Sequence, residues 1–399
     1  MIMCKLLISC DDNLFVYRGR YYFKDQEWCN FYKRYLRVFD SLRIAVRCEL
    51  VDELKPCRIL IDDARIEVVD IPNFSGPVEY AKKYFKIGWI LKNICKGCDA
   101  AIVRLPSTIG QRVARKVIKN HIPYAVEVVY DAEDGWRSET RCVNRFLWKR
   151  IDKEMRETCY NADGVSCVTE SYLQKHYFSK KNGAFTSHYS TLELPESFYG
   201  SAKKFPQVKL FTIANVANQI QFNGRKGFNE IIEAISLLKK KGIIVNAKFV
   251  GQDYHNGIAQ FKDFSRRLNV EDQIEYMGYL TRTELDAFLS SVDMFVMPTR
   301  AEGLPRVIIE AMAKGLPAIS TPVSGNPELL DAHFLVKYED VQTLANRIEE
   351  LIIDKELYEK TSFENFNNSQ KYEATVLEKR RDRFYQELKQ ISKKAKELL

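Results

Sequence analysis

Short apolar segments alternate with segments of helical periodicity along almost the whole chain, and this alternation limits the possible folds more than any other feature. We expect strands at residues 5–10, 42–48, 100–105, 124–129 and 164–169 in the first half, and at 209–214, 245–251, 274–278, 294–298, 316–321 and 334–336 in the second. Strands that alternate with helices predict parallel sheets covered by helices on both faces. The expected fold class is therefore α/β.

The length of the chain predicts two domains. It has 399 residues, of which 46% are hydrophobic, so it can build two cores. Residues 194–206 contain two prolines, a glycine-serine pair and two lysines, which is typical of a linker. We expect one domain at residues 1–200, a second at 207–375, and a C-terminal helix at 376–399, where no glycine or proline occurs.

Two carboxylates frame the most informative motif. Glu302 and Glu310 lie eight positions apart, with a Gly-Leu-Pro turn and then an apolar run at helical spacing between them. Since residues 294–298 look like a buried strand, Glu302 should lie in a loop and Glu310 about two turns into a helix. Backbone N–H groups at a helix start can bind a phosphate. Glu302 would then face the group attached to that phosphate, and Glu310 could accept hydrogen bonds from a ribose.

This segment resembles the E-x7-E signature of the group 1 (family 4) retaining glycosyltransferases, in particular those of bacterial polysaccharide assembly. The resemblance implies the GT-B fold: two Rossmann-like domains face a central cleft, and a C-terminal helix crosses back to the first domain. It also implies that Glu302 contacts the donor sugar as a catalytic residue. The implied donor-binding residues of the segment are Gly303, Leu304, Pro305, Arg306 and Glu310.

A basic, glycine-rich turn precedes this motif. In the turn at 223–228, Lys226 resembles the lysine that holds the donor diphosphate in the family and is assigned to catalysis as well as binding. The family's second basic residue is missing, because residues 218–220 are Asn-Gln-Ile. Either Arg225 substitutes for it, or Gln219 contributes a neutral hydrogen bond.

Two further segments of the second half resemble family elements. Met277 and Tyr279 lie at the strand end that meets the nucleobase, whereas Tyr276 is expected in the core. The turn at 324–328 resembles one that borders the donor site. There we expect a helix capped by Asn326 with Pro327 at its first position. A plain loop is the alternative.

The first half would bind the acceptor. Gly19 lies in an aromatic and basic stretch that resembles a glycine-bearing loop near the donor phosphates. The histidine that many family members carry at the end of a middle strand is absent from residues 124–135. Asp131, or else Glu133 or Asp134, could take the acceptor proton. No D-x-D motif occurs in this stretch, and the family usually acts without metal, so we expect no metal and no cofactor.

Charge and composition suggest where such a protein works. Residues 1–204 carry 34 Lys and Arg against 26 Asp and Glu, a field suited to anionic lipid or a pyrophosphate-bearing acceptor. The segments 111–119 and 136–156 look basic and amphipathic, so they either dock to a membrane or are ordinary helices with solvated charge. No apolar run reaches about 20 residues. All ten cysteines, which end at Cys167, are expected as reduced thiols. We expect a cytoplasmic protein that associates peripherally with the inner face of the membrane.

The sequence therefore predicts a retaining glycosyltransferase in surface polysaccharide synthesis. It would move a sugar from a nucleoside-diphosphate sugar to a hydroxyl of a glycan acceptor, which is expected to be lipid-linked. Nucleic acid is not expected as a partner. Two alternatives stay open: a sugar-nucleotide epimerase of the same architecture, and a non-catalytic glycan- or lipid-binding protein.

Overall fold

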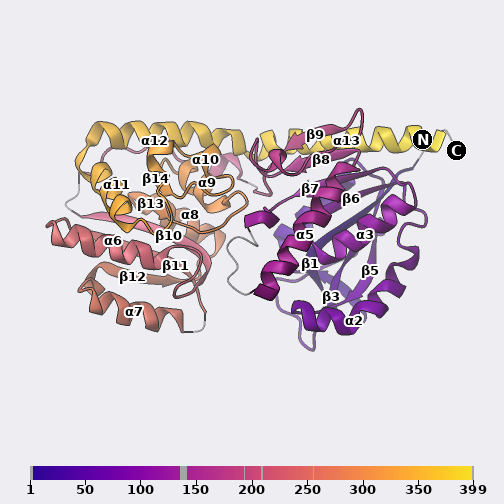
Figure 1. Cartoon of the computed structure of the whole chain (residues 1–399), viewed down its shortest axis with the longest axis horizontal. Coiled ribbons are helices and arrows are strands. Elements are labelled where there is room, and N and C mark those ends of the chain that lie inside the picture. The colour runs from indigo at the N-terminus through magenta and orange to yellow at the C-terminus, as the bar shows by residue number, and fades with distance from the viewer. Residues whose placement is uncertain (1–2, 135–141, 193, 208–209, 255, 398–399) are drawn as a thin grey trace. The chain divides into compact units, whose positions relative to one another are not determined.

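The chain forms two compact α/β units (Figure 1). The computed structural model describes residues 3–134, 142–192, 194–207, 210–254 and 256–397. The first unit comprises Met1–Tyr189 and Glu378–Leu399, and the second comprises Ser190–Leu377.

The predicted linker at 194–206 lies within the second unit. The hydroxyl of Tyr199 donates to the carbonyl of Ser369 at 3.0 Å. The N–H of Gly200 donates to the carbonyl of Ala313 at 2.9 Å. These bonds place the segment with the second unit, so the division falls at residue 190, ahead of the predicted linker.

The sheet of the first unit is mostly parallel. Its parallel strands follow the order β5-β3-β1-β6-β7-β8-β9, and the short strands β2 and β4 are attached antiparallel at the far end of β1. The bounds are β1 Lys5–Tyr17, β2 Arg20–Phe23, β3 Ser41–Leu50, β4 Ile59–Leu60, β5 Ile66–Pro72, β6 Ala100–Leu105, β7 Tyr124–Val128, β8 Gly164–Cys167 and β9 Phe185–His188. Every residue of β7 is buried, as expected for a central strand covered on both faces.

The first strand is longer than predicted. It continues past Cys10 to Tyr17, because β3 continues beside it as far as Leu50. The chain then reverses through Arg18 and Gly19, both with positive φ, to form a two-residue hairpin with β2. The stretch predicted as a glycine-bearing loop is therefore a β-hairpin with Gly19 at its tip.

Helices of the first unit pack on this sheet and on each other. They are α1 Gln26–Lys33, α2 Gly76–Ile90, α3 Thr108–Lys119 and α5 Cys142–Tyr160, together with most of α13 Ala374–Glu397. Helix α3 contacts β1 and β6, and α5 contacts α3.

A buried carboxylate ties α13 to the first unit. Glu127 of β7 accepts hydrogen bonds from the hydroxyls of Tyr35 (3.0 Å), Tyr189 (2.9 Å) and Tyr385 of α13 (2.8 Å). The guanidinium of Arg34 lies 3.7 Å from the same carboxylate. Burial alone would raise the pKa of Glu127, but the nearby arginine charges and the donated hydrogen bonds lower it overall. Glu127 is therefore an anion that holds the C-terminal helix.

The second unit contains a parallel sheet in the order β12-β11-β10-β13-β14. Its strands are β10 Phe211–Ile220, β11 Val245–Asp253, β12 Ile274–Gly278, β13 Met294–Met297 and β14 Ala318–Ser320. The prediction of a strand at 334–336 is wrong. Only an isolated bridge between Leu335 and Ser320 forms there, because a turn of 3₁₀-helix at Ala332–Phe334 occupies the segment.

Helices complete the core of the second unit. They are α6 Phe228–Lys240, α7 Gly257–Arg267, α8 Arg282–Ser291, α9 Arg306–Ala313, α10 Asn326–Leu329, α11 Val341–Ile353 and α12 Lys355–Ser369. Helix α11 packs on α6, and α12 packs on α9. The predicted alternation of strands and helices around parallel sheets is thereby confirmed in this unit.

Candidate active site

Two loops of the second unit meet at the carboxyl edge of its sheet. One follows β10 and the other follows β13, and the two strands are parallel neighbours, so their ends lie side by side. The carbonyl of Arg225 in the first loop accepts hydrogen bonds from the hydroxyl of Thr299 and the N–H of Arg300, both at 2.9 Å. These bonds fix the two loops against each other.

The connected loops bring Lys226 and Glu302 together as an ion pair. The pair is partly exposed, with 32% of the lysine side chain and 15% of the glutamate side chain accessible. Asn215 of β10 donates to the carbonyl of Lys226 at 3.2 Å and so holds the loop in place. The two predicted catalytic residues of this unit therefore lie next to each other, and their side chains form an ion pair.

Gly227 allows the close approach of the loops. Its φ is +75°, and a Cβ atom there would lie 2.3 Å from the carbonyl oxygen of Pro298. A larger residue would push the two loops apart, since real Cβ atoms do not approach an oxygen so closely. The glycine in the basic turn is thus required for packing at the site.

Helix α9 begins directly after the second loop. Its N-cap is Pro305, and no side-chain hydrogen bond caps it. The turn before it is buried at Gly303, Leu304 and Pro305, whereas Arg306 is exposed. The carbonyl of Gly303 accepts a hydrogen bond from Gly325 at 3.0 Å, which joins this turn to the one before α10.

Glu310 lies on α9 and is paired with Arg282 at the start of α8. Only 8% of the Glu310 side chain is accessible, compared with 48% of Arg282. The guanidinium of Arg282 also lies 4.5 Å from the ring centre of Phe198, and Lys314 lies 4.2 Å from the same ring. Glu310 is thus held by a cation that the sequence analysis did not single out.

The end of β12 carries the residues expected near a nucleobase. Tyr279 is 66% exposed and Met277 is half-buried. Tyr276 packs against Phe249 and Phe261, at ring distances of 5.8 and 6.4 Å, which confirms the core role expected for it. An exposed aromatic ring next to a half-buried thioether can stack on a planar base.

The turn before α10 differs in part from the prediction. The N-cap is Gly325, whereas Asn326 was expected there. The amide of Asn326 instead points back to the strand, where it donates to Ser320 Oγ and to the carbonyl of Thr321, both at 2.9 Å. Ser324 adopts a positive φ of 44°, a conformation that glycine adopts more readily than serine.

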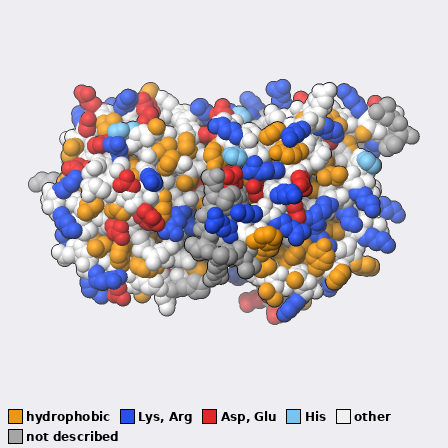
Figure 2. Space-filling model, in the orientation of Figure 1, with side chains coloured by type: hydrophobic (Ala, Val, Ile, Leu, Met, Phe, Trp, Pro, Cys, Tyr) orange, Lys and Arg blue, Asp and Glu red, His pale blue; other side chains and the backbone are white. Residues whose placement is uncertain are grey.

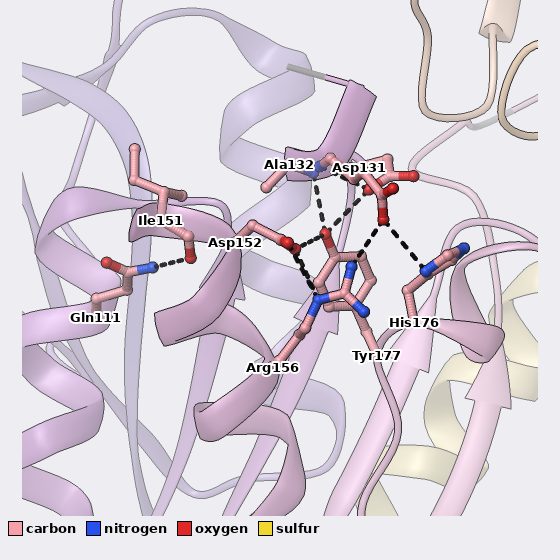
Figure 3. A network of polar contacts seen from close by, with 9 residues as sticks. Gln111, Asp131, Ala132, Ile151, Asp152, Arg156, His176 and Tyr177 are labelled. Carbon is pink, nitrogen blue, oxygen red and sulfur yellow. Dashed lines mark hydrogen bonds and ion pairs between the residues drawn. The ribbon is translucent and has the colours of Figure 1, made fainter. Parts of the chain in front are cut away.

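In the first unit, Asp131 lies at the centre of a polar network (Figure 3). It follows β7 and has no accessible surface. Its Oδ1 lies 3.0 Å from the hydroxyl of Tyr177, which is also 2.7 Å from Asp152 Oδ1. A phenol has one proton, so Tyr177 donates to one carboxylate at a time. Burial, and then the charge of Asp131, raise the pKa of Tyr177, which therefore stays protonated.

The other carboxylates of this network lie next to basic side chains. Arg156 lies 3.1 Å from Asp152 and 2.9 Å from Glu133, and His176 lies 3.5 Å from Glu133 (Figure 3). The N–H of Glu133 donates to Asp131 Oδ1 at 2.9 Å. Asp131 therefore lies at the start of a helical turn, within hydrogen-bond distance of the Tyr177 hydroxyl. Asp131 is fully buried in the described structure, and its role in proton transfer stays a prediction.

A second carboxylate of the first unit was missed by sequence reasoning. Asp12 lies where β1 departs from regular pairing with β3, between Ser9 and Asn13. It is 8% exposed, and burial raises its pKa to about 7. Its Oδ2 has no hydrogen-bond partner among the described residues. A buried carboxylate with a raised pKa, at an irregularity within a strand, is a candidate for proton transfer. Its position directly after an apolar strand was the available signal.

Comparison with known proteins finds similarity to a known family in the second unit. Residues 214–366 match the family model described as glycosyl transferases group 1. The resemblance to the group 1 glycosyltransferases is confirmed. Over 394 residues the chain is 26% identical to protein CapJ of Staphylococcus aureus. The aligned region covers 97% of this chain and 96% of CapJ. Over 133 residues it is 32% identical to the putative colanic acid biosynthesis glycosyltransferase WcaL of Escherichia coli, covering 31% of this chain and 32% of WcaL.

Solved structures extend the comparison to the fold of the whole chain. A sucrose-phosphate synthase of Thermosynechococcus elongatus aligns with a TM-score of 0.68 at 15% identity, over 96% of this chain and 99% of that one. HepE of Anabaena, solved with UDP, aligns with a TM-score of 0.64 at 14% identity, over 94% and 98%. The predicted fold class, two Rossmann-like units of the GT-B type, is confirmed.

One departure from the group 1 pattern persists in the structure. Residues 218–220, where the group usually has a second basic residue, continue strand β10. Arg225 is exposed in the adjacent loop, and Gln219 is exposed in the strand. Arg282 is a further exposed cation next to Glu310. Arg282 follows Thr281, whose side chain caps α8 in a capping box shortly after β12.

Proposed function

We propose that this protein is a retaining glycosyltransferase that moves a sugar from a nucleoside-diphosphate sugar to a hydroxyl of a lipid-linked glycan in bacterial surface polysaccharide synthesis. The observation that carries the proposal is the meeting of Lys226 and Glu302 at the carboxyl edge of a unit that matches the group 1 family model. The names of the relatives support the process, since WcaL is described as a glycosyltransferase of colanic acid biosynthesis.

Different residues of this arrangement can bind different groups of a donor. Lys226, once released from Glu302, would hold the diphosphate together with the backbone at the start of α9. Glu302 would then turn to the sugar hydroxyls. Glu310, about two turns along the helix, would accept hydrogen bonds from the ribose, with Met277 and Tyr279 beside the base. UDP is the first nucleotide to test, because HepE was solved with it.

Catalysis would be mainly electrostatic. The bond between the sugar and the diphosphate breaks as negative charge develops on the departing phosphate, and a positioned lysine lowers the energy of that state. Lys226, Arg225 and the N–H groups around 303–306 would supply this stabilisation. We propose that no metal takes part. The acceptor hydroxyl would attack the same face of the sugar, and Asp131 is the predicted acceptor of its proton.

The membrane and the cytoplasm belong to the proposal as well. A lipid-linked acceptor would bring the protein to the inner face of the cell membrane, where nucleotide sugars are available. Within the part of the chain that the structure describes, no helix is long and apolar enough to cross a membrane. We propose that contact with the bilayer is made from its surface.

The test begins with the donor. Thermal stabilisation by UDP, GDP, ADP and dTDP should identify the base, since a ligand of the native state raises the melting temperature. The matching radiolabelled donor, incubated with a lipid-linked glycan extract, should yield a labelled product whose anomeric configuration equals that of the donor. A changed sugar on the nucleotide without any acceptor would indicate the epimerase instead. Stabilisation without turnover under any condition would favour a binding protein.

A further inference from the structure

Helix α2 of the first unit presents an apolar face to solvent. Val78 is 68% exposed, Phe85 is 85% exposed and Trp89 is 78% exposed. Ile87 is the fully buried residue of the same helix. Large apolar side chains that are exposed together on one element mark a binding surface, whereas single ones need no explanation.

The spacing of these residues places them in one line. Phe85 and Trp89 lie seven and eleven positions after Val78. On an α-helix this spacing brings both side chains to within about 20° of the direction of Val78. Ile87 lies on the opposite side, about 180° from Val78. A surface helix normally buries its apolar stripe against the core. In α2 the apolar stripe faces away from the core.

The helix is nevertheless firmly attached to the unit. Arg112 of α3 donates to the carbonyl of Tyr84 at 3.0 Å, and its guanidinium lies 4.2 Å from the centre of that ring. Gly88 makes room for it, since a Cβ there would lie 2.8 Å from Arg112 Nη2. Tyr80 packs on Phe74 at 5.1 Å. The outward stripe is therefore part of an anchored helix.

The charge around the stripe selects the partner. Residues 76–96 contain five lysines and a single acid, Glu79. Lys82 and Lys86 are exposed on the helix, and Lys92 and Lys96 are exposed after it. Figure 2 shows hydrophobic side chains interspersed with Lys and Arg on the face of this unit. Exposed aromatic residues flanked by lysines fit an anionic lipid surface, where the rings enter the headgroup layer and the lysines meet the phosphates.

We propose that α2 is the membrane-docking element of this protein, with Val78, Phe85 and Trp89 inserted among the headgroups of an anionic leaflet. The inference deepens the proposed function, because it names the surface by which the protein would reach a lipid-linked acceptor. It also relocates the predicted contact. In the segment 111–119, Val113 and Val117 are buried and Arg115 pairs with Glu154, so that helix serves the interior. Of the segment 136–156, residues 136–141 lie outside the described residues, and Phe146 is exposed in the remainder.

The test is vesicle binding of matched double variants of the full chain. Phe85→Ser with Trp89→Ser should lower partitioning onto phosphatidylglycerol vesicles at least about tenfold, whereas Ile353→Ser with Phe363→Ser should leave it unchanged. The control residues are 69% and 58% exposed and lie in the second unit. Equal losses in both double variants, or no binding by the unchanged protein, would overturn the proposal. An assembly state in solution that depends on Phe85 and Trp89 would overturn it too, because a second copy would then cover the stripe.

Two further readouts separate insertion from simple charge attraction. Lys82→Gln with Lys86→Gln should weaken binding more than Lys262→Gln with Lys355→Gln at low salt, and the difference should vanish at high salt. Trp89→Phe should keep binding and abolish most of the blue shift of tryptophan emission on vesicles, and a retained shift would contradict insertion of this residue. Transfer to a short water-soluble acceptor should be the same in Phe85→Ser/Trp89→Ser as in the unchanged protein. Loss of docking with that transfer intact would therefore be distinct from failure of the proposed function.

Discussion

The ion pair between Lys226 and Glu302 leads to a prediction with an unusual sign. In the structure, the lysine that should hold the diphosphate is paired with a carboxylate. A nucleoside diphosphate must therefore displace Glu302 before it gains the full contact with Lys226. Glu302→Gln removes this competitor and one negative charge next to the phosphates. We expect it to bind the bare nucleotide more tightly than the unchanged protein.

The size of the expected change in nucleotide affinity follows from how exposed the ion pair is. A pair that is 32% and 15% accessible is worth more than a fully solvated one, for which about 0.2–1 kcal/mol is typical. We take about 1 kcal/mol, which corresponds to roughly fivefold tighter binding by Glu302→Gln. Lys226→Ala loses a charge-assisted hydrogen bond of about 1.5–3 kcal/mol and leaves Glu302 facing the phosphates, so binding should weaken by more than about tenfold. The double variant should lie between Lys226→Ala and the unchanged protein.

Calorimetric titration with the best-stabilising nucleotide, at one fixed ionic strength, measures all four affinities as a double-mutant cycle. Lys240→Ala, which removes an exposed charge of α6 in the same unit, is the control and should have no effect. Weaker binding by Glu302→Gln would refute the competition argument, because Glu302 would then support the nucleotide. Equal affinities in all four proteins would place the site elsewhere. Turnover of the nucleotide sugar should fall in Glu302→Gln although the nucleotide binds more tightly.

Three other predictions concern the remaining buried charges. Glu127→Gln should lower the free energy of unfolding of the first unit by about 3 kcal/mol, and Tyr385→Phe should lower it by about 1 kcal/mol. Urea unfolding followed by tryptophan fluorescence measures both changes, since all four tryptophans lie in that unit. The folded-state pKa of Glu127 is lowered, so its contribution is complete above about pH 4.3 and is lost as the pH falls through the folded value, and the two proteins should become equally stable in acid. Glu310→Gln should weaken binding of the bare nucleotide, whereas an unchanged affinity would remove the ribose role and leave Glu310 as the partner of Arg282 alone. Asp131→Asn should reduce transfer by about 100-fold at an unchanged melting temperature if it accepts the proton, and a lower melting temperature with transfer retained would make it a structural residue.

Local patterns in the sequence were sufficient for much of the second unit. The carboxylate spacing, the turn before α9 and the basic turn at Lys226 involve neighbours in the chain, whose relation depends on helix and turn geometry. The strand after Cys10 was misjudged for the opposite reason. Asp11 to Asn13 are polar and interrupt the apolar run, and the strand continues across them because β3 pairs with the residues on both sides of the interruption. Such pairing is not encoded within the segment itself.

The sequence by itself determined the class of fold and the order of the two units, because periodicity is a local property, and the candidate donor residues came from its resemblance to the group 1 glycosyltransferases. The tertiary structure decided which polar groups are paired: Lys226 with Glu302, Glu310 with Arg282, and Asp131 with the hydroxyl of Tyr177. It also decided the role of α2. The spacing of Val78, Phe85 and Trp89 shows that they share one side of a helix, and any buried helix has the same spacing. Whether that side meets the core or the solvent depends on which residues of the other elements pack around the helix, and only the folded chain establishes that.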